Sequence, residues 1–180
     1  CEKIFVMNLH PIFVHFPIAF FTFYSLAELI RFKKITALPY WFYIKAILLI
    51  LGIASAYTAL LSGELIRDMF VGMDSLVEVH SVLAKITTLL FTIIAFFYVL
   101  SWIQKNNFSF VKKLRNNLLW IYLLKLQKFI LNTQLIIIFA FIGLLLITIT
   151  GVLGGIIAFG PDTDPLTKFI YELLMQSGIK

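Results

Sequence analysis

Four long apolar runs constrain what this chain can fold into more than any other feature of its sequence. They cover residues 9–30, 38–62, 77–103 and 133–159. A run of about 20 apolar residues is long enough for a helix to cross the hydrocarbon core of a membrane. The sequence therefore predicts an all-α integral membrane protein, in which four spanning helices form a bundle within a single membrane domain, residues 1–180.

The composition agrees with this class of protein. Of the 180 residues, 61% are hydrophobic, which exceeds the ~45–50% of an ordinary soluble domain. The net charge of +6 comes from basic residues that cluster beside the apolar runs. Anionic lipid headgroups and membrane topology explain this clustering better than nucleic acid does. The sequence contains no phosphate-binding loop, dinucleotide fingerprint or hydrolase motif, and we predict no catalytic residue.

Two shorter segments are expected to lie outside the spans. Residues 104–132 interleave six basic side chains with leucine and aromatic residues, which predicts an interfacial amphipathic helix before the fourth span. Residues 165–176 are expected to form a short C-terminal helix, because Gly160-Pro161 ends the fourth span.

The charges of the loops predict how the chain is oriented. The first and third loops are basic, whereas the second loop, residues 63–77, is net acidic. Basic loops remain in the cytoplasm. We therefore expect both termini and the second loop on the outer, periplasmic side of a bacterial inner membrane. The three histidines of the chain, His10, His15 and His80, would then all lie near the outer face.

The single cysteine, Cys1, excludes an internal disulfide and a CxxCH haem-attachment motif. It cannot be an initiator residue. Two interpretations stay open: a lipidated cysteine left after signal-peptide cleavage, or a clipped start for which Met7 is the true initiator.

The histidines are the candidate cofactor ligands, because ionisable groups inside a spanning helix are costly and usually functional. His15 lies about 7 Å deeper than His10 along a helix. At that depth an unligated imidazole would lose its hydration without compensation. We therefore predict that His15 and His80 ligate the iron of a haem b, with His10 beside the site.

Small and basic residues are expected to complete the haem site. A flat macrocycle packed edge-on between helices needs a small residue one turn from each ligand, and cations near the outer interface can meet its propionates. The predicted cofactor-binding residues are His10, Ala19, Ala84, Gly151, Gly155 and Lys85, with Arg67 as a further cation.

Other interpretations of the same residues stay open. Gly151 and Gly155 form a GxxxG pattern, which is also typical of helix packing. Copper is an alternative cofactor, because Met7, Met69 and Met73 lie on the same outer side and soft ligands favour Cu(I). In a third interpretation there is no cofactor, and the histidines only organise helix ends.

Two features are expected to hold the helices together. The second span carries small residues at three- or four-residue spacing, a pattern for close helix packing: Gly52, Ala56, Ala59 and Gly63. Glu28 and Lys45 lie towards the cytoplasmic ends of their spans, where we expect either a structural ion pair or charges that snorkel towards the interface.

The run Leu-His-Pro-Ile-Phe-Val-His-Phe-Pro-Ile-Ala at positions 9–19 resembles the opening signature of a bacterial membrane family, domain of unknown function 2231. Members of that family have four spans, a histidine at the start of the third, and a fourth span ending in Thr-Gly-x-Leu-Gly-Gly. His80 and residues 150–155 match these features. Residues 159–165 resemble one branch of the family, whereas residues 156–158 depart from the Leu-Val-Tyr of many members.

The resemblance implies an electron-transfer setting, because the family occurs near or fused to cytochrome c-like modules. We therefore expect a haem b-binding membrane subunit that transfers electrons near the outer face. It would act within a larger respiratory or photosynthetic-type complex, or with a cytochrome c-like partner, among membrane lipids and without nucleic acid. The competing expectation is a non-catalytic accessory or assembly subunit of a membrane complex, with structural histidines.

Overall fold

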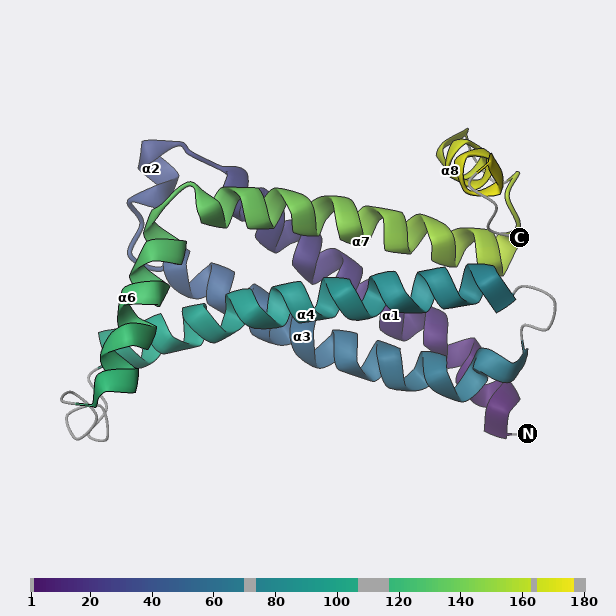
Figure 1. The fold of residues 1–180 in the computed structure, drawn as a ribbon, viewed down its shortest axis with the longest axis horizontal. Helices are drawn as coiled ribbons and strands as arrows, with labels where there is room; N and C mark the ends of the chain where they lie inside the picture. Colours follow the sequence, from purple (N-terminus) through teal and green to yellow (C-terminus); the bar gives the residue numbers. More distant parts are fainter. Residues whose placement is uncertain (1, 70–73, 107–116, 163–164, 177–180) are drawn as a thin grey trace.

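The computed structural model describes residues 2–69, 74–106, 117–162 and 165–176, and the regular elements within them are all helical. In chain order these elements are α1 (Glu2–Leu29), α2 (Lys33–Thr36), α3 (Trp41–Ile66), η1 (Arg67–Met69), α4 (Asp74–Lys105), α6 (Leu118–Asn132), α7 (Leu135–Phe159) and α8 (Pro165–Gln176) (Figure 1). The predicted all-α four-helix bundle is confirmed.

Four helices are long and apolar enough to cross a membrane: Leu9–Leu29 in α1, Trp41–Ile66 in α3, Ser75–Lys105 in α4 and Leu135–Phe159 in α7. They cover the four apolar runs of the sequence. A helix satisfies its own backbone hydrogen bonds, which is what a chain segment inside lipid requires. The chain is a multi-pass membrane protein.

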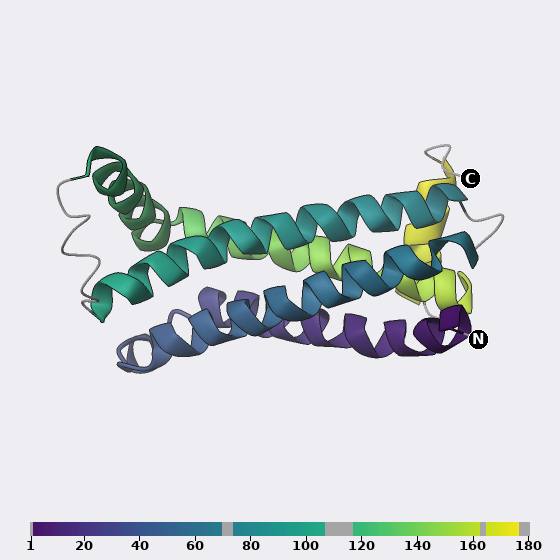
Figure 2. The ribbon, with the colours of Figure 1, turned by 90° about the horizontal axis from the view of Figure 1, so that it is seen from below.

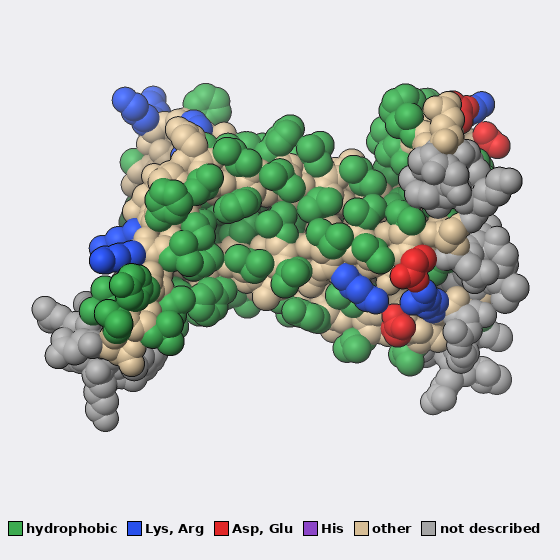
Figure 3. Space-filling model, in the orientation of Figure 1, with side chains coloured by type: hydrophobic (Ala, Val, Ile, Leu, Met, Phe, Trp, Pro, Cys, Tyr) green, Lys and Arg blue, Asp and Glu red, His purple; other side chains and the backbone are tan. Residues whose placement is uncertain are grey.

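The four spans form a ring in which each helix packs on two neighbours. α1 and α4 each pack on both α3 and α7. Both chain termini lie at one end of the bundle together with η1 and α8, and α2 and α6 lie at the opposite end (Figures 1 and 2). Hydrophobic side chains cover the surface between the two ends, and the acidic side chains seen on this face lie at the end with the termini (Figure 3).

Capping residues mark the beginning of α6 and the end of α7. The Asn117 side chain caps α6, because its Oδ1 accepts hydrogen bonds from the backbone N–H groups of Leu119 and Trp120. α7 ends at Gly160, whose φ of +88° suits glycine. α8 then covers the residues expected for the C-terminal helix. Residues 107–116 of the predicted interfacial segment lie outside the described residues.

The bundle consists of two helical hairpins, α1 with α3 and α4 with α7, whose side chains correspond. His10 and Phe21 of α1 match His80 and Phe91 of α4, 70 residues further along the chain. The match extends to burial, since the lipid-facing and buried positions of the two helices alternate in almost the same order.

The second helices of the hairpins correspond in the same way. Gly52 and Gly63 of α3 match Gly143 and Gly154 of α7, 91 residues further on. Because α1 and α4 run in the same direction, the two hairpins are related by a pseudo-twofold axis along the bundle. Parallel repeats of this kind occur in other membrane proteins.

Two phenylalanine rings stack at the centre of the bundle. The ring centroids of Phe21 and Phe91 lie 4.0 Å apart, with an angle of 10° between the ring planes. Each ring lies against a glycine of the adjacent helix. A Cβ atom at Gly52 would approach the Phe21 ring to 2.5 Å, and one at Gly143 would approach the Phe91 ring to 2.6 Å. These glycines therefore make room for the central rings.

A buried ion pair lies about 10 Å from this stack towards the α2 and α6 end. Lys45 Nζ lies 2.9 Å from a carboxylate oxygen of Glu28, and the side chains are 14% and 5% exposed. The Tyr98 hydroxyl donates a 2.6 Å hydrogen bond to the same oxygen. The hydroxyl of the neighbouring Tyr24 makes no hydrogen bond within the described residues. The predicted pair of Glu28 and Lys45 is confirmed.

Substituting Gly143 with alanine is expected to destabilise the bundle by about 1–3 kcal/mol, because the added methyl group overpacks the central stack. Gly155→Ala is the matched control. A Cβ atom there meets nothing within 4 Å, so this variant should be as stable as the parent or slightly more stable. The free energy of unfolding in mixed micelles measures both. Equal losses at the two positions would contradict this account of the stack.

Removing one charge of the buried pair is expected to cost about 3 kcal/mol of unfolding free energy, because the remaining charge loses its partner inside the membrane. Lys45→Met and Glu28→Gln should each show this loss. The double variant Glu28→Gln/Lys45→Met should regain much of the stability, because it buries no unpaired charge. Losses that simply add in the double variant would show that the two side chains do not depend on each other.

Candidate functional site

His10 of α1 reaches across to the neighbouring helix α3. Its Nδ1 atom lies 2.7 Å from the Ser62 hydroxyl oxygen. The ring lies over Gly63, where an added Cβ atom would be 3.1 Å from the imidazole Cε1. A larger residue than glycine would displace the ring, so Gly63 allows His10 to reach Ser62.

His80 of α4 occupies the corresponding position in the second hairpin. Its Nδ1 atom lies 3.1 Å from the backbone carbonyl oxygen of Thr150 on α7. Gly154 lies beneath the ring, and a Cβ atom there would be 3.3 Å from Cε1. The two histidines therefore have the same arrangement: Nδ1 bonded to the adjacent helix and a glycine against the ring.

These contacts assign one tautomer to both neutral rings. A carbonyl oxygen can only accept, so His80 Nδ1 carries the proton and donates it to Thr150. The Ser62 hydroxyl donates its single proton to the Ala59 carbonyl oxygen at 2.9 Å, so Ser62 accepts from His10 Nδ1. Each ring thus presents its lone pair on Nε2. Hydrogen bonds of this kind orient the histidines of metal sites.

The two rings lie at the same level on opposite sides of the pseudo-twofold axis. Each histidine precedes the central phenylalanine of its own helix by eleven residues, which is about 16 Å along the axis. The pair lies at the end of the bundle that carries the termini and α8.

His15, the predicted partner of His80, lies elsewhere. It is exposed, as is Phe16 beside it on the outward face of α1. Five residues of helix separate His10 and His15 by about 140° around the axis, and His10 takes the inward position. Ala19, one turn below His15, is also exposed. The structure therefore turns His10 rather than His15 inward, against α3, at the level of His80.

The other predicted cofactor-binding residues lie on α4 and α7. Lys85 is exposed at the position of α4 that matches His15 of α1, and Ala84 is half-buried. Gly151 and Gly155 do not contact the rings; Gly154 does. In the GxxxG pattern, a Cβ atom at Gly151 would lie 3.6 Å from Ile18 of α1, whereas one at Gly155 would meet none of the described residues within 4 Å.

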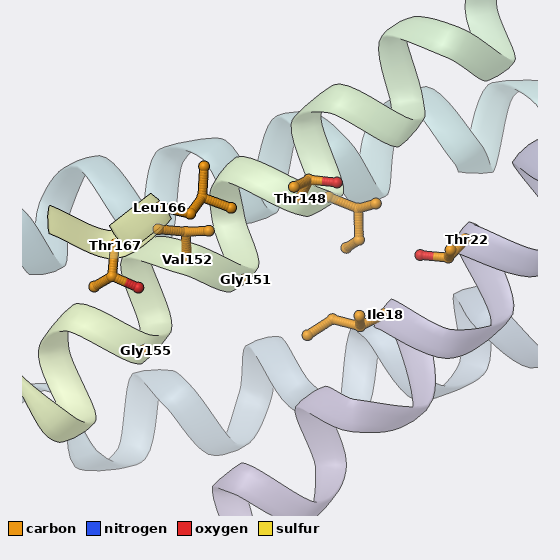
Figure 4. A pocket seen from close by; sticks show the side chains of 9 residues that line it. Ile18, Thr22, Thr148, Gly151, Val152, Gly155, Leu166 and Thr167 are labelled. Atoms are coloured by element: carbon orange, nitrogen blue, oxygen red, sulfur yellow. The ribbon is translucent and has the colours of Figure 1, made fainter. Parts of the chain in front are cut away.

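Gly151 and Gly155 instead line a pocket of about 360 Å³ between α1, α7 and α8. Its walls are mainly aliphatic, with three threonines (Figure 4). The lining residues are Ile18, Thr22, Ile147, Thr148, Gly151, Val152, Gly155, Leu166 and Thr167.

Of the remaining candidates, Arg67 forms ion pairs, and several others lie outside the described residues. Arg67 pairs with Glu78, and its other terminal nitrogen lies 4.0 Å from Glu64. Of the methionines considered for copper, Met69 is 37% exposed, whereas Met73 and the side chain of Met7 lie outside the described residues. Cys1 also lies outside them. Among the residues that the structure describes, no three His, Cys, Asp or Glu side chains gather as a metal site.

Sequence reasoning missed Ser62, and it did not assign Thr150, Gly63 and Gly154 to the imidazole rings. A signal for them exists in the sequence. The eleven-residue spacing from histidine to phenylalanine occurs twice, and so does the eleven-residue spacing from glycine to glycine. Aligning these two spacings pairs His10 with His80 and assigns each ring its glycine.

We compared the chain with protein-family models, with curated proteins and with solved structures, and none of them matches it.

Proposed function

We propose that this chain is a membrane subunit that binds haem b through His10 and His80 and transfers electrons near the outer face. The observation that carries the proposal is the pair of imidazoles with matching environments. Each has Nδ1 bonded to a neighbouring helix, and within the described residues Nε2 makes no hydrogen bond and could accept a ligand bond. A bound haem b would supply one-electron redox chemistry at this position.

The donor set suits a metal that needs two protein ligands. Haem iron takes four nitrogens from its macrocycle and two axial ligands from the protein, and two neutral imidazoles from facing helices are a common choice. A structural zinc ion would need about four protein ligands. The matching environments of His10 and His80 would suit two protein ligands of the same kind.

The hydrogen bonds at Nδ1 give Ser62 and Thr150 a defined role in this proposal. They fix the direction of each ring and increase the electron-donating strength of Nε2. Gly63 and Gly154 let the rings reach these partners. The chain thus contributes orientation and tuning around the ligands, which are the levers that a protein has over a haem potential.

The bacterial inner membrane is the proposed location, with the histidine end outside. The supporting observation is the charge distribution, because Arg31, Lys33 and Lys34 lie at the end opposite the histidines, with Lys125 and Lys128 of α6. Basic segments of this kind remain in the cytoplasm. In this orientation α6 lies along the inner surface as an interfacial helix, with exposed leucine and aromatic side chains in contact with lipid.

The resemblance to domain of unknown function 2231 supports an electron-transfer setting within a larger membrane complex. The second candidate is an accessory or assembly subunit without a cofactor. One observation favours it: the same hydrogen bonds tie α1 to α3 and α4 to α7, which is a structural role that needs no metal.

The histidine variants test the haem proposal. His10→Ala and His80→Ala should each abolish the low-spin haem spectrum of the purified protein, because each removes an axial ligand. His15→Ala is the control and should keep the spectrum, since His15 faces outward. A pyridine haemochrome assay measures the haem content. If the parent protein holds no haem, the accessory role is favoured. Loss of haem in His15→Ala alone would assign the ligand to the exposed side of α1, where His15 lies.

Cysteine labelling tests the orientation. In a chain with Cys1→Ser, Glu172→Cys on α8 should react with an impermeant maleimide added to intact cells. Lys128→Cys on α6 should react only after lysis. Both side chains are exposed, so accessibility within the protein does not limit either reaction. The reverse labelling pattern would place the histidine end in the cytoplasm.

A further inference from the structure

We propose that the pocket between α1, α7 and α8 binds the ring of a membrane-dissolved quinone. The choice of a redox-active ligand rests on the proposed electron-transfer function. The site itself rests on the pocket's lining, on one hydroxyl group and on a difference between the two hairpins.

The lining excludes a charged ligand. Its walls are the aliphatic side chains of Ile18, Ile147, Val152 and Leu166, and none of the described residues that line it is ionisable. A phosphate or carboxylate would find no cation there and would have to lose its hydration. An uncharged molecule dissolved in the membrane suits this lining. The volume of about 360 Å³ lies within the range of small-molecule pockets.

Thr22 supplies a hydrogen-bond donor to this apolar space. The Thr148 hydroxyl donates a 2.7 Å hydrogen bond to the backbone carbonyl oxygen of Leu144. Thr92, the counterpart of Thr22 in the second hairpin, donates a bond of the same length to the carbonyl oxygen of Thr88. Within the described residues the Thr22 hydroxyl makes no such bond. Its oxygen points into the pocket (Figure 4). A carbonyl oxygen of a bound quinone would accept a hydrogen bond from this hydroxyl.

The two glycines that line the pocket have no glycine counterpart in the first hairpin. The positions of α3 that match Gly151 and Gly155 of α7 hold Leu60 and Glu64. Helix packing does not require the two glycines, because a Cβ atom would lie 3.6 Å from Ile18 at Gly151 and would meet nothing at Gly155. The space is therefore a departure from the pseudo-symmetry rather than a consequence of the fold.

The position of the pocket suits a quinone that enters from the lipid and exchanges electrons with a haem at the histidine pair. Thr22 directly follows Phe21 of the central stack, so the pocket begins near the middle of the bundle. Gly155 directly follows Gly154, which contacts the His80 ring. A ring in this pocket would lie between the centre of the membrane and the candidate haem ligands.

Native mass spectrometry of the detergent-solubilised protein with decylubiquinone tests this site. We expect one quinone per chain. Gly155→Leu fills the open space and should raise the apparent Kd at least tenfold. Thr22→Val keeps the shape of the side chain but removes the donor, and should raise the Kd about threefold or more. Ala19→Leu adds bulk on the exposed face of α1 and should leave binding unchanged.

The outcomes separate this inference from the haem proposal. Haem content and spectrum should be the same in Gly155→Leu as in the parent protein. Haem without quinone binding, or quinone binding that is unchanged in Gly155→Leu, would overturn the pocket assignment and leave the haem proposal intact. A retained phospholipid that Gly155→Leu displaces, without quinone binding, would also overturn it. Quinone binding that is lost in Gly155→Leu supports the site, even if the parent protein holds no haem.

Discussion

The close approach of a flat ring to a glycine on the neighbouring helix is the contact on which this bundle depends. It occurs four times: with Phe21, Phe91, His10 and His80, each against the glycine of the adjacent helix. Lipid tails are as apolar as leucine, so burial of apolar surface does little to hold spanning helices together. Close packing and interhelical hydrogen bonds must do so instead. Glycine allows both, because it lets a ring pack tightly and lets an imidazole reach the next backbone.

The pseudo-twofold relation between the hairpins separates structural from specialised positions. Positions that match in both halves build the central stack and the histidine pair. Positions that differ between the halves form the buried ion-pair cluster at one end and the pocket towards the other. Glu28 matches Tyr98, and the two meet in a hydrogen bond across the axis. Gly151 and Gly155 match larger residues of α3, and the pocket lies where they differ.

Polar side chains inside the membrane are arranged so that most find a partner. Thr87, Thr88 and Thr150 donate to carbonyl oxygens of their own helices, and Lys45 pairs with Glu28. Within the described residues, the buried Tyr24 and Ser25 hydroxyls lack a hydrogen-bond partner. The Thr22 hydroxyl, which lines the pocket, and the Nε2 atoms of the two histidines are three further groups for which no partner is seen there. An unsatisfied polar group is costly in a medium without water, which is why these three groups are the centre of the functional proposals.

The sequence by itself determined the class of the protein and the number of spans, because hydropathy reports whether a segment lies in lipid. It also placed both termini at one end and paired Glu28 with Lys45. Tertiary structure decided which histidine faces inward. Spanning helices are apolar on their lipid-facing and core-facing sides alike, so a hydropathy pattern does not fix their rotation. Hydropathy therefore does not distinguish His10 from His15. The tertiary structure does, because His10 packs against Gly63 of α3 and contacts Ser62, whereas His15 is exposed.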